Sequence, residues 1–186
     1  MKKLVLAIVV LAASFFSVAA QSSKKMWVGG SVGISSFKPK GGDTYTNYSL
    51  LPEFGYIVNS QLSVGINAGF QQYEYSSSSL VATNKMEGIT VYPFLRCSVL
   101  NKGVGSIFVD AGVGYTSLRD KDLDYTLDAI EIGFKPGVAL KVSDTFQFTA
   151  KFGFVGMRNY SDYYEATEYG LNLDLSDVLL GVNFIF

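Results

Sequence analysis

The sequence contains no histidine and a single cysteine, Cys97. Without histidine there can be no Ser–His or Cys–His catalytic pair, no histidine-containing zinc site and no histidine pH switch. With one cysteine no intrachain disulfide can form, and we interpret Cys97 as a small hydrophobic residue of a strand. These absences argue against the common hydrolytic enzymes and against a disulfide-stabilised domain.

Charge is scarce as well. Charged residues make up 17% of the chain and the net charge is −1, whereas about a quarter of a soluble protein is charged. A nearly neutral chain has no electrostatic footprint for nucleic acid. No internal run reaches the roughly 18 apolar residues that a membrane helix needs. The hydrophobic 48% of the chain, with its 19 glycines, 14 phenylalanines and 12 tyrosines, therefore indicates short strands in a twisted, closed sheet.

Residues 1–20 have the pattern of a cleavable signal peptide. Two lysines follow Met1, an apolar segment runs from Leu4 to about Phe16, and small residues precede a predicted cut between Ala20 and Gln21. The alternative, an uncleaved membrane anchor, needs a longer apolar segment and a stop-transfer flank. No cysteine follows the apolar segment, which argues against a lipoprotein. The predicted mature chain is then one domain, residues 21–186.

The mature chain repeats a period-two alternation of apolar with small or polar residues, which is typical of β-strands. We predict eight strands, at about 27–37, 48–58, 61–73, 86–98, 104–117, 125–142, 145–158 and 169–186. Pro93 and Pro136 each remove a ladder donor, so bulges or weakened pairing are expected there. Long polar connections alternate with short ones, which places the long loops at one end of an up-and-down sheet.

The alternation of apolar with small or polar residues does not show which face of the sheet lies inside the barrel. A soluble lipocalin-type barrel has the same alternation, with its apolar face inward. Two features favour a membrane barrel. One face of most strands is apolar over about nine to eleven residues, the length of a tilted bilayer crossing. Aromatic residues also lie near the strand ends, as in the aromatic belts of membrane barrels; they are Trp27, Phe37, Tyr48, Phe70, Tyr115, Phe184 and Phe186.

The last strand carries apolar residues at every second position: Val178, Leu180, Val182, Phe184 and Phe186. This ending resembles the C-terminal assembly signal of bacterial outer-membrane proteins. The segments Leu51-Pro52-Glu53-Phe54-Gly55-Tyr56 and Tyr92-Pro93-Phe94-Leu95-Arg96 add to the likeness.

Together these features resemble the family of small bacterial outer-membrane β-barrel domains, akin to the OmpA membrane domain and to OmpX. The resemblance covers the whole mature chain. It implies an all-β fold, an eight-stranded antiparallel up-and-down transmembrane β-barrel, integral in the bacterial outer membrane after signal-peptide cleavage. It also implies outer-membrane lipid and the barrel-assembly machinery as partners. It implies no shared activity.

If the apolar face meets lipid, the other face points inward and carries charges that must pair or stay wet. We predict a network among Glu53, Arg96, Asp110, Glu131, Lys135 and Lys151, with Lys141 and several amides on the same face. An eight-stranded barrel is just wide enough for side chains to fill it. A packed ion-pair core is therefore the favoured interpretation, and a narrow water or ion path is the alternative.

The function expected from the sequence is non-enzymatic, without cofactor or metal. Outer-membrane hydrolases usually need a histidine beside their serine or carboxylate, so the serine run 76–79 reads as a loop. The carboxylates among the tyrosines of 160–169 match no calcium-loop spacing, and tyrosine is common at interfaces. We expect a monomer with a structural or surface-interaction role through its loops. The alternatives are a narrow porin-like pore, a small-solute-binding barrel and a soluble secreted barrel.

Overall fold

The computed structural model describes residues 25–38, 43–76, 83–120, 124–161, 166–172 and 178–186. The predicted signal peptide and its cleavage site at Ala20 and Gln21 lie outside the described residues, as do loop residues 77–79 and 162–165. Within the described part of the chain, no helix is long and apolar enough to cross a membrane. The strands are β1 Met26–Phe37, β2 Thr44–Ile57, β3 Leu62–Ser76, β4 Thr83–Lys102, β5 Gly105–Asp120, β6 Tyr125–Lys141, β7 Phe146–Lys151, β8 Phe154–Ser161, β9 Ala166–Asn172 and β10 Leu179–Ile185.

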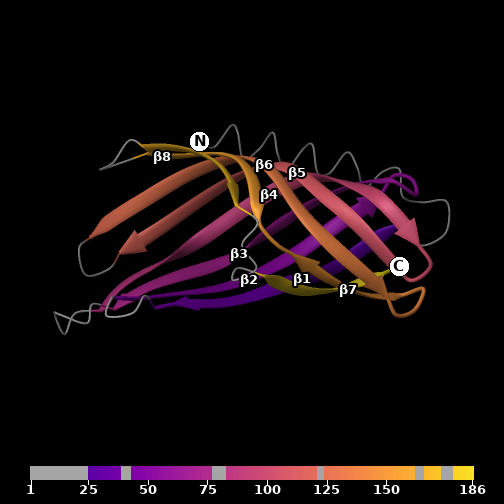
Figure 1. Cartoon of the computed structure of the whole chain (residues 1–186), viewed down its shortest axis with the longest axis horizontal. Coiled ribbons are helices and arrows are strands. Elements are labelled where there is room, and N and C mark those ends of the chain that lie inside the picture. Colours follow the sequence, from indigo (N-terminus) through magenta and orange to yellow (C-terminus); the bar gives the residue numbers. More distant parts are fainter. Residues whose placement is uncertain (1–24, 39–42, 77–82, 121–123, 162–165, 173–177) are drawn as a thin grey trace.

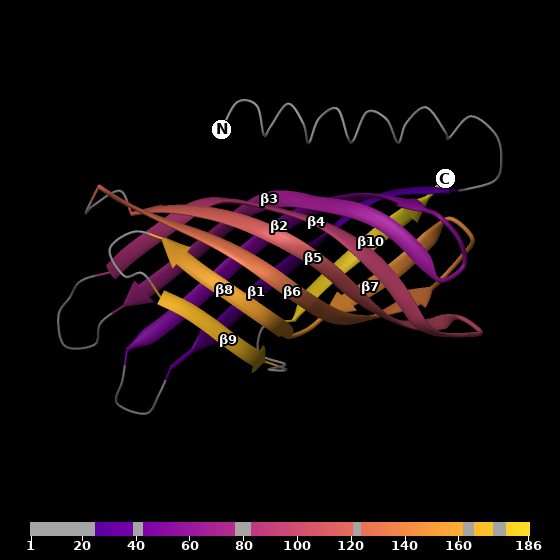
Figure 2. The same cartoon turned by 90° about the horizontal axis from the view of Figure 1, so that it is seen from above.

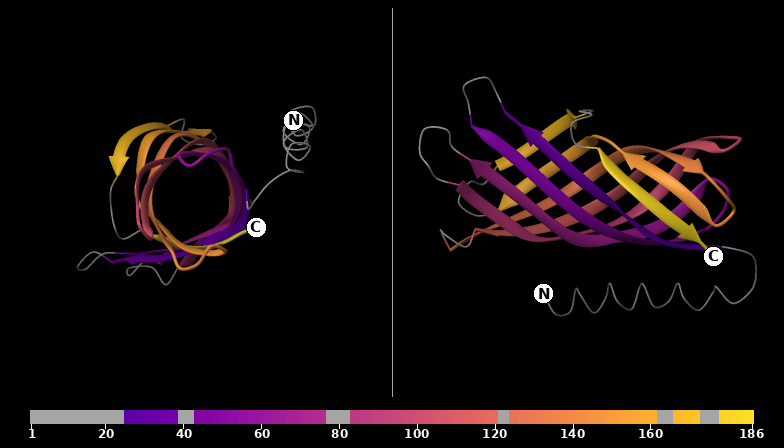
Figure 3. Two further views of the ribbon diagram at one scale, coloured as in Figure 1. Left: turned by 90° about the vertical axis from the view of Figure 1, so that its right-hand side faces the viewer. Right: turned by 90° about the horizontal axis from the view of Figure 1, so that it is seen from below.

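The strands form one antiparallel sheet that closes on itself. From β1 to β6 each strand pairs with the next along the chain, β6 pairs with β7, β7 with β10, and β10 with β1. The strands appear as a ring when the molecule is viewed down its long axis (Figure 3). Together β7 and β8 form the predicted seventh strand, and β9 and β10 form the eighth. The predicted all-β, eight-stranded antiparallel barrel is confirmed.

The seventh strand is interrupted at Phe152-Gly153, where β7 ends and β8 begins. Gly153 has a φ of +73°, a left-handed conformation that glycine adopts without strain. Lys151 and Phe154 both point inward, with 4% and 7% of their surface exposed, so the alternation shifts by one residue. Uninterrupted alternation from Phe146 would place Phe154 on the outer, apolar face. The one-residue shift turns Phe154 inward instead, because it exchanges the two faces for the rest of that strand.

This interruption also changes the pairing of β6. Its C-terminal part, Gly137–Lys141, pairs with β7, and its N-terminal part, Asp128–Phe134, pairs with β8. β8 in turn pairs with β9, and the two lie side by side near the loop end (Figure 2). Among the described residues β9 pairs with β8 alone, and β1 pairs with β10 only as far as Val32. The ring is thus complete at the end with the short turns.

Pairing is altered near both prolines, in a different way at each. The β4–β5 ladder lacks the pairs at Tyr92 and Pro93, and its register is the same on both sides of that gap. Pro136 lies where β6 changes its partner from β8 to β7. The register shift of β4 lies instead between Ser98 and Leu100. Pairing is therefore weakened at Pro93 and shifts by one residue opposite Pro136, as predicted, whereas the shift in β4 was not predicted.

The two faces of the barrel differ sharply. Its outside carries large apolar side chains with about half of their surface exposed, such as Val113 (48%), Ile132 (50%) and Leu180 (60%). Its inside holds buried aromatic rings, among them Tyr92 and Phe108 at 1% exposure each. A soluble barrel with its apolar face inside is contradicted by this arrangement, because the apolar face is the outer one.

Trp27 departs from the predicted aromatic belt. It is 3% exposed and packs in the interior with Tyr92 and Phe94, since its position in β1 has the inward parity of Gly29 and Ser31 rather than the outward parity of Val28. The side chain of Phe37 lies outside the described residues. The other five belt aromatics, Tyr48, Phe70, Tyr115, Phe184 and Phe186, are 40–55% exposed.

Inward glycines make room for these rings. A Cβ atom at Gly55 would overlap the indole of Trp27, and one at Gly137 would overlap the ring of Phe108. In each case the ring lies over the glycine of the adjacent strand. In the interior, a large side chain on one strand therefore packs over a glycine on the adjacent strand. This gives the close packing expected in so narrow a barrel.

Candidate functional site

Four buried charged side chains meet in the interior of the barrel, on the turn side of mid-strand, and we call them the plug cluster: Glu53, Arg96, Asp110 and Lys151. They come from β2, β4, β5 and β7, and their side chains are 1–9% exposed. Arg96 donates to Asp110 through Nε (2.7 Å to Oδ1) and Nη2 (2.8 Å to Oδ2). Arg96 Nη2 also lies 3.0 Å from Glu53 Oε1. Lys151 Nζ pairs with Glu53 and lies 3.2 Å from Asp110 Oδ2.

Aromatic side chains enclose the plug cluster. The guanidinium carbon of Arg96 lies 4.2 Å from the ring centroid of Phe108 and 5.4 Å from that of Trp27. Trp27 Nε1 donates a hydrogen bond to Glu53 Oε1 (3.0 Å). Every charge of the cluster therefore has both an opposite charge and a second contact, which is the condition for burying ions at tolerable cost.

The plug cluster is electrically balanced, with two carboxylates against two cations. Arg96 and Asp110 form a bidentate pair, with two parallel hydrogen bonds. This geometry holds a guanidinium more firmly than a single hydrogen bond does. These four side chains are balanced in charge, are buried and pack together in the interior, in keeping with the narrow width of an eight-stranded barrel.

A second group of charges, Glu131, Lys135 and Arg158, lies on the loop side of the plug; we call it the upper cluster. Glu131 pairs with Lys135, and Arg158 Nε lies 3.1 Å from Glu131 Oε2. Lys135 Nζ sits 3.8 Å from the ring centroid of Tyr92, and the Arg158 guanidinium carbon sits 4.2 Å from that of Phe154. Here two cations share one carboxylate.

The structure divides the six predicted network residues between these clusters. Glu53, Arg96, Asp110 and Lys151 meet in the plug cluster, while Glu131 and Lys135 meet in the upper one. Lys141, predicted on the same face, lies at the exposed turn end and pairs with Asp144 (2.7 Å). The amide side chains of Asn67 and Asn183 are buried inside, at 6% and 3% exposure.

Two contributors were not foreseen from the sequence. Arg158 points inward only because of the shift at Gly153, and a glycine following Phe152 in an otherwise regular strand was the one available signal. Trp27 donates a hydrogen bond to Glu53. The local alternation of the sequence does not distinguish a tryptophan that points inward at a strand end from one that belongs to the aromatic belt.

The residues of the predicted assembly signal lie on β10 and beside it. Leu180, Val182 and Phe184 point outward with 60%, 36% and 50% of their surface exposed. Val178 immediately precedes β10. Phe186 follows it and exchanges backbone hydrogen bonds with Met26 (3.0 and 2.8 Å), so the last residue takes part in closing the ring against β1.

On the loop side of the plug the interior widens into a cavity of about 530 Å³, which we call the vestibule. Lys151 and the upper cluster form the charged part of its lining. Its walls combine polar side chains, such as Gln71, Thr90 and Thr116, with apolar ones, such as Leu51 and Leu118. The vestibule ends at the plug cluster.

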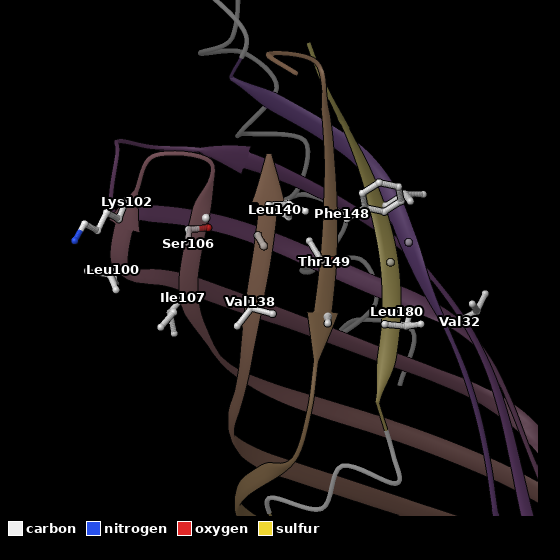
Figure 4. A pocket seen from close by; sticks show the side chains of 16 residues that line it. Val32, Leu100, Lys102, Ser106, Ile107, Val138, Leu140, Phe148, Thr149 and Leu180 are labelled. Atoms are coloured by element: carbon white, nitrogen blue, oxygen red, sulfur yellow. The ribbon is translucent and has the colours of Figure 1, made fainter. Parts of the chain in front are cut away.

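A hollow of about 890 Å³ lies on the outside, over β1, β10, β7, β6, β5 and β4. Apolar side chains such as Val32, Leu180 and Val138 line it (Figure 4). These residues belong to the exposed apolar face, so this groove is part of the outer surface rather than of the lumen. Among the described residues no group of three acidic or cysteine side chains is placed to hold a metal ion.

An apolar outside around an ion-paired inside is the organisation of a membrane barrel. Residues 6–186 match the family of the outer membrane protein beta-barrel domain. The chain belongs to this family. Family membership places it in the outer membrane. The predicted family is thereby confirmed.

Solved structures of outer-membrane barrels share the fold. The outer membrane protein OprG of Pseudomonas aeruginosa has a TM-score of 0.55 at 11% identity, over 89% of this chain and 97% of OprG. Neisserial surface protein A has a TM-score of 0.55 at 13% identity, over 89% of this chain and 100% of its own. The outer membrane protein W of E. coli has a TM-score of 0.52 at 15% identity, with the same coverage. No curated protein matches the sequence.

Proposed function

We propose that this outer-membrane barrel is non-enzymatic and non-conducting, and that it acts as a structural or surface-interaction protein through its loop end. The observation that carries the proposal is the plug cluster, whose four charges from four strands are neutralised inside the lumen. Water does not easily displace a bidentate ion pair that packs against aromatic rings, as Arg96 and Asp110 do beside Phe108. Such a lumen favours a role at the outer surface over transport.

The rest of the proposal concerns how the chain reaches the membrane and what it meets there. The signal peptide would direct export and be cleaved after Ala20. Insertion into the outer membrane would then use the barrel-assembly machinery, which would read the alternating residues up to Phe186. The barrel would be a monomer, with the long connections available to a partner at the cell surface. Catalysis is disfavoured because no histidine is available to activate a serine or to relay a proton.

The rival is a narrow pore, and planar-bilayer conductance separates the two. The purified chain should give no steady conductance above leak. Replacing both Arg96 and Asp110 by alanine removes the bidentate pair and should produce discrete conductance steps. Replacing Lys141 and Asp144 by alanine removes an exposed pair at the turn end and should leave the bilayer silent. Steady conductance of the unaltered chain would establish the pore and overturn the proposal.

A further inference from the structure

Among the described residues, the charges that line the vestibule are unbalanced. Three cations, Lys135, Lys151 and Arg158, line it together with one carboxylate, Glu131. Lys151 is already neutralised within the plug cluster, which contains two acids and two bases. The upper cluster therefore holds one positive charge more than its single carboxylate neutralises.

Arg158 is the cation best placed to present this surplus. Its Nε is engaged with Glu131 at 3.1 Å, and its side chain keeps 33% of its surface exposed. The guanidinium lies over the ring of Phe154, which fixes its plane. Lys135, by contrast, is held between Glu131 and the face of Tyr92. Arg158 also makes a side-chain hydrogen bond with Tyr160. A guanidinium has five N–H donors, so Arg158 retains donors for a second anion, and its planar fork suits a carboxylate.

The surroundings indicate what else such a ligand would carry. The vestibule lining places apolar Leu51, Leu118 and Phe154 near polar Thr90 and Thr116. Cavities that combine an apolar lining with a few convergent polar groups are typical of small-molecule sites. At about 530 Å³ the vestibule has room for a ligand of several carbon atoms.

The other carboxylates near the loop end that the structure describes do not line the vestibule. Asp120, on β5, is buried and lies outside its lining. Glu168, on β9, is exposed and accepts a hydrogen bond from Tyr160 Oη at 3.3 Å. Glu131 is thus the carboxylate that competes directly with an incoming anion for Arg158.

From these observations we infer that the vestibule is a binding site for a small organic monoanion, a carboxylate with a short apolar body, whose charged group pairs with Arg158 above the plug. The ligand enters from the loop end and goes no further, because the plug cluster forms the floor. This inference goes beyond the proposed function. Binding could fail while the lumen stays closed, and the lumen could conduct while the site still binds.

The test uses the full mature chain in nanodiscs of zwitterionic lipid, with 6,6,6-trifluorohexanoate as the probe and ¹⁹F NMR titration as the readout. The corresponding amide is the uncharged comparison, and nanodiscs without protein correct for partition into lipid. A charge-assisted hydrogen bond predicts at least tenfold tighter binding of the carboxylate than of the amide. Equal binding of the two, or no binding of either, would overturn the inference.

Variants separate the site from nonspecific attraction. Arg158→Gln leaves Glu131 paired with Lys135 alone, a neutral arrangement, and should abolish the preference for the carboxylate while the barrel stays folded. Arg158→Lys should keep most of the preference, and Glu131→Gln should tighten carboxylate binding several-fold. Lys85→Gln, at an exposed lysine outside the vestibule, should change nothing. A preference that survives Arg158→Gln would contradict the assigned site.

Discussion

Replacing Asp110 by asparagine is expected to lower the free energy of unfolding by about 3–5 kcal/mol, the cost of leaving a buried charge without its partner. Asp110 accepts both hydrogen bonds of the bidentate pair from Arg96 and faces Lys151 at 3.2 Å. An asparagine presents one acceptor oxygen, so two cations would then face the single carboxylate of Glu53. Urea titration in lipid vesicles, followed by the fluorescence of Trp27, would measure the loss.

Trp27 is the sole tryptophan of the chain and donates to Glu53, so its emission reports on the plug cluster itself. Asp144→Asn is the matched control, because it removes a carboxylate from an exposed pair; such pairs contribute about 0–1 kcal/mol. Adding Lys151→Met to Asp110→Asn removes the surplus cation and should restore part of the stability. An Asp110→Asn loss no larger than that of Asp144→Asn would refute the buried network.

Replacing Val109 by arginine is expected to cost about 2–4 kcal/mol, the penalty for a cation on the lipid face near the middle of the bilayer. Val109 neighbours Asp110 in β5 and therefore points to the opposite side of the sheet. It follows the exposed Ile107 by two residues and precedes the exposed Val113 by four, which places it within the apolar band of the outer face.

The same urea titration would test this change. Ser117→Arg is its control, because Ser117 has the same outward parity on β5 and lies nearer the loop end, where the expected penalty falls to about 0–1 kcal/mol. A large cost at Ser117 with none at Val109 would mean that the apolar band has been placed at the wrong height.

Much of the fold follows from the sequence because alternation is a local property. In the third strand, small or polar residues alternate with apolar ones from Leu62 to Gln71, and in the fifth strand the inward Phe108 is the exception between Ser106 and Thr116. The apolar residues of both strands took the predicted outer face. The predicted short turn between β2 and β3 was also confirmed. There Val58 and Asn59 both donate their backbone N–H to the carbonyl of Leu62 at 3.0 Å. In a closed up-and-down barrel, each strand pairs with its neighbours along the chain. This pairing already determines the order of the strands, so few alternative topologies remain.

What could not be predicted depends on contacts between distant strands or on a single backbone angle. Glu53 and Lys151 are 98 residues apart in the chain, and alternation says only that both point inward, not that they meet. The positive φ of Gly153 exchanged the faces of Phe154 and Arg158. The split into a balanced plug and a positively charged vestibule depends on that one angle, because Arg158 supplies the surplus charge.

The assignment of the two faces is the claim on which the plug, the vestibule and both stability predictions depend. Spin labels at Val113 and Thr116 would test it most directly. Both residues lie in β5; Val113 is exposed on the outside, and Thr116 lines the vestibule. The labels would be attached to cysteines in a Cys97→Ser background, because Cys97 is itself exposed. The protein would be reconstituted in lipid vesicles.

Oxygen concentrates in the lipid core, while a charged nickel chelate stays in water, so collision rates with the two relaxing agents distinguish the environments. We expect oxygen to relax the label at 113 more strongly than the label at 116, and the nickel chelate to do the opposite. The reverse pattern, with the label at 113 facing water and the label at 116 facing lipid, would contradict the account.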